Sequence, residues 1–327
     1  QTLLSLRSYP VTSTMKFNRR DFLQLSGGAA VGSMGLGCTK SKPEPVDFDP
    51  LGWIDAHVHI WSPELERWPL GKGFTVERMK PPSFTVDELL AECRPHGVAR
   101  VVLIQMSFYR DDHSYLLHAM ENWPGLFAGV ALVDPEAEDA VDQLRRLQKQ
   151  GVTGFRIRAT GEKIATWPDS EGMREFWKIG AEENLSMCCL ADADALPGIH
   201  RMCEQFPETP VVIDHCGRIG TSGEIIQSDV DNLLRLAEFE SVRVKTSAFY
   251  ALGEKQAPYT DLGPMIHQLR DAYGAERLMW ATDCPYQVQK GHTYGDSIAL
   301  IRDRLDFLTD EEKQWILRDT AEKVFFR

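Results

Sequence analysis

The chain has 327 residues, of which 43% are hydrophobic and 26% charged, as in an ordinary globular protein. This length allows one large α/β domain or two smaller ones. The formal net charge of −12 offers no basic surface for nucleic acid or anionic lipid, so we expect neither as a direct partner.

Residues 1–37 carry the pattern of a cleavable export signal. Arg19 and Arg20 form a twin-arginine pair before a short, weakly apolar segment that is rich in glycine and alanine. A charged stretch followed by such a segment is typical of a targeting signal, and the segment is too short to span a membrane. The pattern resembles a Tat signal with Met15 as its natural start, so we expect the protein to be exported.

Cys38 follows this segment and begins a charged, proline-rich stretch, residues 38–50, that we expect to act as a tether. The pattern resembles a bacterial lipoprotein cleavage site. Two outcomes stay open: a lipid on Cys38 that anchors the protein to a membrane, or cleavage and release into the periplasm. Membrane contact is expected only through such a lipid.

From residue 51 onward, short β-type runs alternate with longer amphipathic runs. Strands are predicted at 53–56, 101–105, 127–132, 154–158, 186–190, 211–214, 242–246 and 278–281. Helices are predicted at 85–96, 114–123, 136–150, 172–184, 195–206, 229–240 and 259–273, with a final helical region at 297–325.

This alternation predicts parallel strands joined by helical crossovers. Eight such units match a (β/α)8 TIM barrel, and we expect residues 51–327 to form it as a single domain. A doubly wound sheet is the less favoured alternative, because no glycine-rich phosphate loop follows the first strand.

The first predicted strand has polar side chains at alternate positions: Asp55, His57 and His59. Side chains two apart on a strand point the same way, so the three are expected to share one face. Ile54 and Val58 would then face the surrounding helices. We expect Asp55 to anchor the strand, and His57 and His59 to end it at the barrel mouth.

Function in a barrel of this kind is located at the C-terminal ends of the strands. Imidazole or carboxylate groups end three of the predicted strands: His57 and His59, His215, and Asp283. Such groups suit a zinc ion, so all four are candidate metal ligands. Asp283 is also a candidate general base for an attacking water, and His215 a second candidate catalytic residue.

Other polar residues at strand ends are candidate substrate contacts. Arg156 and Arg158 share one face of the fourth strand and could bind a carboxylate or carbonyl group. A structural ion pair with Asp214 or Asp112 is the alternative for these arginines.

For residues on or after the second and seventh strands, a substrate contact and a purely structural role are likewise both open. Lys245 could hold the same anion or neutralise a buried acid. Gln105, Tyr109 and His113, which end or follow the second strand, could contact substrate or belong to a merely polar loop.

The segments around these residues resemble a known family. "IDAHVHIW", "VVIDHCGR", "VKTSAFY", "MWATDCPY" and "DTAEKVF" resemble the amidohydrolase superfamily, within its amidohydrolase-2 group. "VVLIQMSFYRDDHSYLLHAM", "FAGVALVDP" and "GVTGFRIRA" resemble the lactonase branch, which includes sugar-lactone, pyrone-dicarboxylate and sulfomuconolactone hydrolases. The resemblance extends over nearly all of residues 51–327. It implies a (β/α)8 barrel, a site made of His57, His59, His215 and Asp283, and hydrolysis of a C–O or C–N bond.

The chain departs from the superfamily pattern at two strands. Many members have a lysine after the fourth strand that bridges two metals, where this chain has Arg156 and Arg158. The fifth strand, "LSMCCLA", lacks the histidine that decarboxylase members use as a ligand. We therefore expect one divalent ion, zinc being favoured, or catalysis without metal in which histidines and arginines polarise the carbonyl.

Three functions follow as hypotheses. In the leading one, the protein opens a sugar lactone or a carboxylated cyclic ester, as Asp283 takes a proton from water and returns it to the leaving alkoxide. The second is a metal-dependent decarboxylase of an aromatic acid, which the fifth strand disfavours. The third is a non-catalytic exported lipoprotein that binds a sugar acid. The sequence indicates no oligomeric state.

Overall fold

The computed structural model describes Asp49 and residues 51–327. The expected export signal, the Cys38 cleavage site and all of the tether except Asp49 lie outside these residues. None of the helices in the described part of the chain is both long and apolar enough to cross a membrane.

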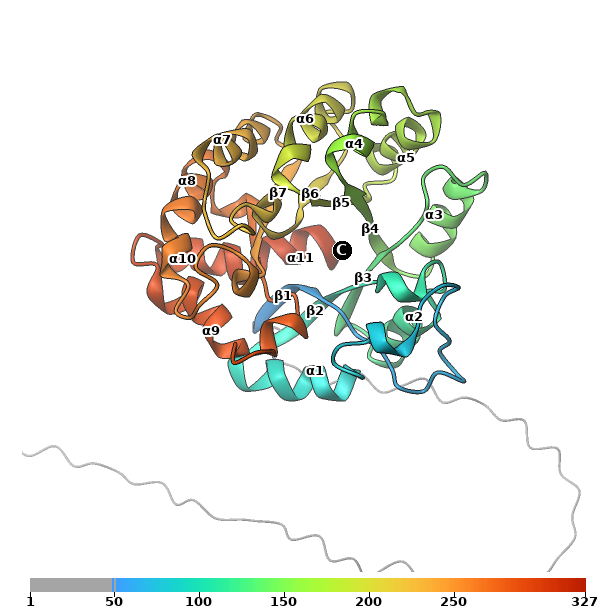
Figure 1. The fold of residues 1–327 in the computed structure, drawn as a ribbon, viewed down its shortest axis with the longest axis horizontal. Helices are drawn as coiled ribbons and strands as arrows, with labels where there is room; N and C mark the ends of the chain where they lie inside the picture. The colour runs from blue at the N-terminus through green and yellow to red at the C-terminus, as the bar shows by residue number, and fades with distance from the viewer. Residues whose placement is uncertain (1–48, 50) are drawn as a thin grey trace, which may run out of the picture. The chain divides into compact units, whose positions relative to one another are not determined.

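Eight strands pair in sequence order into one parallel sheet that curls into a nearly closed, TIM-barrel-like structure (Figure 1). They are β1 (Trp53–Val58), β2 (Val98–Ile104), β3 (Phe127–Ala131), β4 (Val152–Ala159), β5 (Ser186–Ala191), β6 (Val211–Ile213), β7 (Val242–Ser247) and β8 (Leu278–Ala281). All eight predicted strands and their parallel pairing are confirmed.

The seam between β8 and β1 has no regular ladder. A single bridge joins Val58 to Cys284, and two backbone hydrogen bonds flank it. The amide of Asp283 donates to the carbonyl of His57 over 2.9 Å, and that of His59 donates to the carbonyl of Cys284 over 2.8 Å. The seam therefore joins the segments that carry three of the four predicted metal ligands, His57, His59 and Asp283.

Helices surround the barrel and connect its strands (Figure 1). They are α1 (Val86–Cys93), α2 (Ser114–Asn122), α3 (Ala140–Gln148), α4 (Gly161–Ile164), α5 (Glu171–Glu182), α6 (Leu196–Gln205), α7 (Gln227–Arg235), α8 (Gly263–Tyr273), α9 (Tyr294–Ala299), α10 (Asp310–Gln314) and α11 (Thr320–Phe325). The final helical region is divided rather than continuous. A new helix, α10, begins after Thr309, whose hydroxyl caps it in a capping box with Glu312.

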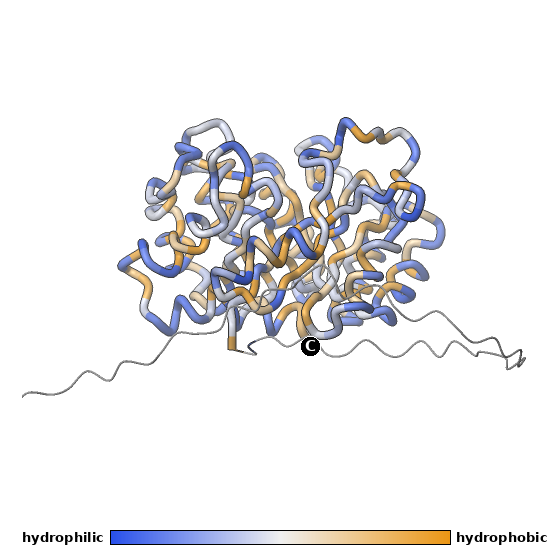
Figure 2. Tube along the Cα trace, turned by 90° about the horizontal axis from the view of Figure 1, so that it is seen from below, coloured by the Kyte–Doolittle hydropathy of each residue, from blue (hydrophilic) through white to orange (hydrophobic). Residues whose placement is uncertain are grey.

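Two layers of apolar side chains form the core. The outer layer lies between strands and helices, and the inner one fills the barrel with residues such as Ile54, Val130 and Met279. Figure 2 shows hydrophobic segments inside the molecule and hydrophilic ones around its edge. Helix α11 closes the barrel at the N-terminal ends of the strands. There the hydroxyl of Thr153, at the start of β4, donates to the carbonyl of Phe325. The opposite, C-terminal end of the strands holds a cavity.

The predicted assignment of side chains to the two faces of β1 is wrong at the start of the strand. Ile54 belongs to the inner layer rather than facing the helices, so the next side chain, Asp55, points outward. There its carboxylate accepts hydrogen bonds from the Thr282 amide at 3.0 Å and the Tyr294 hydroxyl at 2.7 Å, which confirms the anchoring role. The pairing of β1 with β2 shifts register between Asp55 and Val58. This irregularity returns Val58 to the outer layer and turns His57 toward the barrel mouth.

Candidate active site

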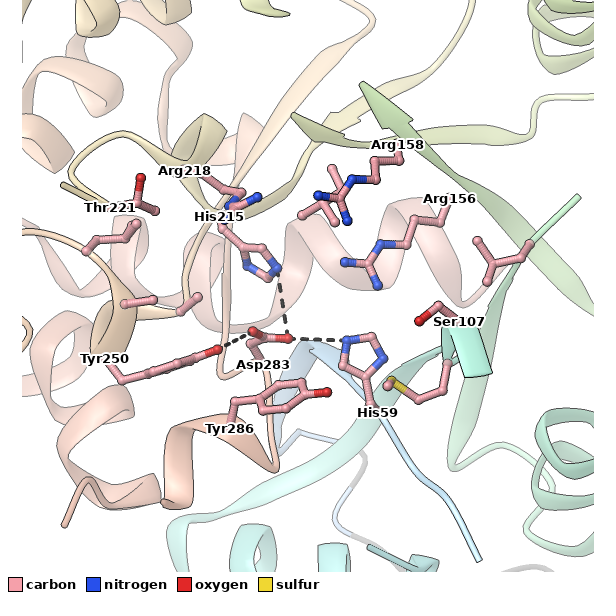
Figure 3. A pocket seen from close by; sticks show the side chains of 16 residues that line it. His59, Ser107, Arg156, Arg158, His215, Arg218, Thr221, Tyr250, Asp283 and Tyr286 are labelled. Atoms are coloured by element: carbon pink, nitrogen blue, oxygen red, sulfur yellow. Dashed lines mark hydrogen bonds and ion pairs between the residues drawn. The ribbon is translucent and has the colours of Figure 1, made fainter. Parts of the chain in front are cut away.

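A cavity of about 510 Å³ lies at the C-terminal ends of the strands (Figure 3). Each of the eight strands, or the loop after it, contributes to the lining. The lining includes His59, Met106, Ser107, Leu132, Arg156, Arg158, Leu190, His215, Arg218, Ala248, Tyr250, Asp283 and Tyr286. Its position and size are those of a ligand site in this type of barrel.

Three imidazoles converge on one oxygen of Asp283. The Oδ1 atom lies 3.3 Å from His59 Nε2, 3.7 Å from His57 Nε2 and 3.9 Å from His215 Nε2. The structure thus brings together all four residues that the sequence singled out as metal ligands.

The backbone at two of these residues adopts an unusual conformation. His215 has φ 55° and Asp283 has φ 67°, in the left-handed region that side chains with a Cβ rarely adopt. Strain of this kind tends to accumulate at functional sites, where the surrounding structure holds it in place. Here it aims both side chains at the cavity.

The second ring nitrogen of each histidine is held by a neighbour. His59 Nδ1 lies 2.9 Å from the carbonyl oxygen of Ile104, and His215 Nδ1 lies 2.8 Å from the hydroxyl of Ser247. A carbonyl oxygen can only accept, so Nδ1 of His59 carries a proton. Nε2 of His59, which lies 3.3 Å from the Asp283 carboxylate, is therefore the ring nitrogen that is available to a metal ion.

The donor set fits a divalent ion. One ligand atom each from His57, His59 and Asp283 lie within 4.8 Å of one another. Among the residues that the structure describes, the buried Nε2 of His57 has no hydrogen-bond partner. Nitrogens that face one point while their partner nitrogens are held from behind are characteristic of metal-binding histidines.

The Asp283 carboxylate is ionised and firmly oriented. Burial by itself would raise its pKa, but the adjacent His215, His59 and His57 lower that pKa well below its usual range. Tyr250 donates its hydroxyl proton to Oδ2 over 2.7 Å, as Figure 3 shows, so Oδ1 is left for the imidazoles. Burial lowers the pKa of His215, which favours its neutral form, the form that binds metal.

A buried ion pair lies beneath the imidazoles. Lys245 Nζ is 3.1 Å from Asp214 Oδ1, and both side chains are 0% exposed. His57 Nδ1 contacts both of them, at 3.2 Å from the ammonium and 3.4 Å from the carboxylate. The Phe325 ring lies 5.3 Å below the ammonium. Lys245 thus neutralises a buried acid and does not line the cavity.

The fourth strand supplies two cations. Arg156 and Arg158 leave the same face of β4, as predicted, and Figure 3 shows their guanidinium groups directed toward the space before His59 and His215. Arg156 Nε is 3.9 Å from Asp214 Oδ2, a long contact that leaves most of its donors free. Both arginines line the cavity, in reach of a bound anion.

The structure places three other candidates away from the cavity lining. Gln105 donates to the Asp112 carbonyl at 2.8 Å, Tyr109 accepts from the Ser62 amide at 3.1 Å, and His113 Nε2 lies 2.8 Å from the Leu132 carbonyl. Gln105 thus braces the loop after β2, while Tyr109 and His113 tie that loop to the backbone after β1 and β3. The geometry therefore favours the structural alternative for these three side chains.

Five polar lining residues were missed by sequence reasoning: Ser107, Arg218, Thr221, Tyr250 and Tyr286. Arg218 and Tyr286 each follow a predicted ligand, His215 or Asp283, by three residues. The sequence feature that could have revealed these two residues is a polar side chain within one turn of a predicted ligand. Arg218 also pairs with Asp192 at 2.8 Å.

The chain is similar to known proteins over most of its described length. The amidohydrolase family model (Amidohydro_2) matches residues 54–327. The 4-sulfomuconolactone hydrolase of Hydrogenophaga intermedia is 24% identical over 288 residues, which cover 84% of this chain and 89% of that protein. The L-fucono-1,5-lactonase of Burkholderia ambifaria is 26% identical over 251 residues, which cover 74% of this chain and 83% of that protein.

Two solved structures share the fold. One, of a probable 2-pyrone-4,6-dicarboxylic acid hydrolase from Acinetobacter baumannii with citric acid bound, has a TM-score of 0.71 at 22% identity and covers 84% of this chain and 100% of that chain. The other, an amidohydrolase from Burkholderia multivorans with bound zinc, has a TM-score of 0.69 at 18% identity and covers 83% and 98%. Since the family model spans most of the sequence, this chain belongs to the amidohydrolase family.

Proposed function

We propose that this protein hydrolyses lactones and that its substrate is a cyclic ester bearing an anionic group. One observation carries the proposal: a single cavity has an ionised carboxylate among three imidazoles on one side and the guanidinium groups of Arg156 and Arg158 on the other. The similarity to proteins named as lactone hydrolases supports the same conclusion.

The arginines bind and orient the substrate. A guanidinium group can donate two parallel hydrogen bonds to a carboxylate, which fixes the plane of the bound anion. With its carboxylate on Arg156 or Arg158, the ring ester would lie over His59 and Asp283. Such orientation makes the attack effectively unimolecular.

Asp283 moves the proton. Its ionised carboxylate accepts a proton from the water that attacks the lactone carbonyl carbon. The ester C–O bond then breaks, and Asp283 returns the proton to the alkoxide oxygen that leaves. Tyr250, hydrogen-bonded to Oδ2, holds the carboxylate in place throughout.

We further propose one divalent ion, zinc, held by His57, His59, His215 and Asp283. When bound, it would polarise the carbonyl oxygen and lower the pKa of water. The grouping of His57, His59 and Asp283 ligand atoms, with Nδ1 of His59 held by the Ile104 carbonyl, supports a cation at this point. The residue of the fifth strand that lines the cavity, Leu190, has no group that can bind a metal ion.

Replacement of Asp283 tests the function and the mechanism together. We expect the wild-type protein to open carboxylated lactones faster than their neutral analogues, as followed by acid release with a pH indicator. Asp283→Asn should lower turnover by about 10²–10⁴-fold, the usual contribution of a general base. Circular dichroism should show an unchanged fold, and the exposed Asp306→Asn serves as the matched control.

Three results would overturn the proposal or part of it. Full turnover by Asp283→Asn would refute the role of that residue. Release of carbon dioxide from aromatic acids, with no lactone opened, would favour the decarboxylase instead. Recovery of every lactone unchanged would favour a binding protein.

For residues 1–50 we propose a Tat-type export signal that ends before Cys38, with a tether that is lipidated or released by cleavage. The Arg19–Arg20 pair and the apolar segment after it support the proposal. Cell fractionation of the full chain tests it, with an Arg19→Lys/Arg20→Lys variant expected to remain in the cytoplasm. Cys38→Ala should release the protein from the membrane fraction only if Cys38 carries a lipid.

A further inference from the structure

A second cavity, of about 390 Å³, adjoins the catalytic one. It is lined by Tyr250, Ala251, Lys255, Tyr286, Gln289, Lys290 and His292. Three of these residues, Tyr250, Ala251 and Tyr286, also line the catalytic cavity. The two tyrosine side chains therefore form a shared wall, with the Asp283 carboxylate on one side and the second cavity on the other.

The second cavity is cationic in a protein that is acidic overall. Lys255 and Lys290 supply two positive charges, and no carboxylate belongs to its lining in the described part of the chain. The whole chain carries a formal charge of −12, so a cavity without an acid is a local exception. Its electrostatic potential would attract an anion to the edge of the active site.

Contacts tie this cavity to the catalytic one. Lys255 Nζ donates to the backbone carbonyl of Thr221 at 2.6 Å, and Thr221 itself lines the catalytic cavity. An ammonium has three donors, so Lys255 keeps donors for a ligand. Across the cavity, His292 Nδ1 lies 2.7 Å from the Tyr259 hydroxyl, which positions the imidazole ring.

The backbone that presents the two lysines is also unusual. Lys255 has φ 56° and Lys290 has φ 55°, both in the left-handed region that non-glycine residues rarely adopt. Behind them, the buried Gln287 donates to the Tyr259 hydroxyl at 3.1 Å and to the Thr293 carbonyl at 3.0 Å. The loops are thus held in a defined shape on both sides of the cavity.

We propose that the second cavity is a substrate subsite for an anionic group remote from the lactone ring. The inference rests on the proposed function and narrows its substrate class. The catalytic cavity alone has a volume in the range of about 300–1,000 Å³ that is usual for a complete ligand site. The ring and its first anionic group would occupy that space, and a substituent would extend past Tyr250 and Tyr286 to a second carboxylate, sulfonate or phosphate group held by Lys255 and Lys290.

The test compares two lactones that differ in one charge. Both carry a carboxylate on the ring and a side chain several carbons long, which ends in a carboxylate in one compound and in the uncharged carboxamide in the other. A Lys255→Met/Lys290→Met variant should raise KM for the first compound about five- to tenfold, the effect of losing two partly exposed ion pairs. Its kcat should stay within about twofold of wild type, and the carboxamide compound should be unaffected.

Two further variants serve as controls. Lys149→Met/Lys178→Met removes the same charge from exposed positions that line neither cavity and should leave both KM values unchanged. Lys255→Arg/Lys290→Arg keeps both charges and should restore most of the affinity for the charged compound. Equal KM changes for the two compounds, or none for either, would refute the subsite.

A binding measurement separates failure of the subsite from failure of the proposed function. Calorimetric titration with pentane-1,3,5-tricarboxylate and with glutarate measures anion binding without turnover. If no lactone is opened but the lysine variant loses affinity for the tricarboxylate alone, the proposed function fails and the anion subsite stands. If lactones are opened and the variant does not distinguish the two acids or the two lactones, the subsite fails and the function stands.

Discussion

The ion pair beneath the active site makes a sharp prediction about stability. Lys245→Met removes one partner of a pair whose members are both 0% exposed and 3.1 Å apart. Burying two charges costs several kcal/mol each, so the intact pair contributes little net stability compared with apolar side chains. The loss of one partner is different, because Asp214 then stays buried with only a long contact to Arg156 and a neutral His57 beside it.

The distance between Lys245 and Asp214 determines the expected size of the loss in stability. At 3.1 Å and an effective dielectric constant of about 20, the attraction between the two charges is about 5 kcal/mol. Breaking a buried pair on one side typically costs about 3–5 kcal/mol. For a domain of this size, that loss corresponds to a decrease in Tm of roughly 10 °C. Methionine fills a similar volume, so a cavity contributes little to the change.

The pH dependence of stability provides an independent test of the same ion pair. Burial would raise the pKa of Asp214, but Lys245 and then His57 hold it well below its usual range. Its contribution to stability in the wild type is therefore present above the unfolded pKa and lost only as the pH falls through the lower folded value. Without Lys245 the pKa of Asp214 rises, so the deficit of the variant should be largest near pH 7 and shrink as the pH falls.

Urea denaturation of wild type, Lys245→Met, Asp214→Asn and the double variant measures the coupling. We expect the double variant to be less destabilised than the sum of the two single variants, by about 2–3 kcal/mol. The exposed Lys149→Met controls for loss of a charge and should change stability by less than about 0.5 kcal/mol. Additive effects, or a Lys245→Met variant as stable as wild type, would refute this account of the pair.

Three further predictions follow from the site. Tyr250→Phe removes the hydroxyl that orients Asp283, so kcat should fall about 10- to 100-fold, as expected for a hydrogen bond to a charged group worth about 1.5–3 kcal/mol; unchanged turnover would contradict that role. Burial raises the pKa of Asp55 to about 6, above its unfolded value, so its contribution to stability is present below the unfolded pKa and lost as the pH rises through 6. The free energy of unfolding of wild type relative to Asp55→Asn should therefore increase by up to about 3 kcal/mol between pH 7 and pH 4, and a difference independent of pH would count against this origin. Chelator-treated protein should gain about 5–10 °C in Tm with zinc at 100 times its Kd, whereas His57→Ala should show almost no gain; an equal gain in both would exclude His57 as a ligand.

The sequence alone determined the order of elements and the eight-stranded parallel barrel. Strands that are covered on both faces read as short apolar runs, and the helices between them show amphipathic spacing, so both signals are local. It also determined the group at the centre of the site. His57, His59, His215 and Asp283 each break or end an apolar run, and strand ends in a barrel converge at one mouth.

Only the tertiary structure decided how individual side chains point. The register shift after Asp55 depends on pairing with β2, and strict alternation misplaced Ile54 for that reason. Lys245 on β7 pairs with Asp214, which directly follows β6 and lies 31 residues away in the sequence, and no local pattern shows this pairing. Gln105 could be placed in the site or in the loop until its partners were known.

The loops were the least accessible part of the site. Tyr250 and Tyr286 reach the cavity because turns after β7 and β8 place Ala248 and Asp283 in the left-handed region, which no local pattern of apolar residues predicts. A polar residue at a strand end can be recognised in the sequence because it follows or breaks an apolar run. A polar residue in a loop has polar neighbours and cannot be recognised in this way. The sequence therefore determined where the chemistry is located, and the folded contacts decided which side chains take part in it.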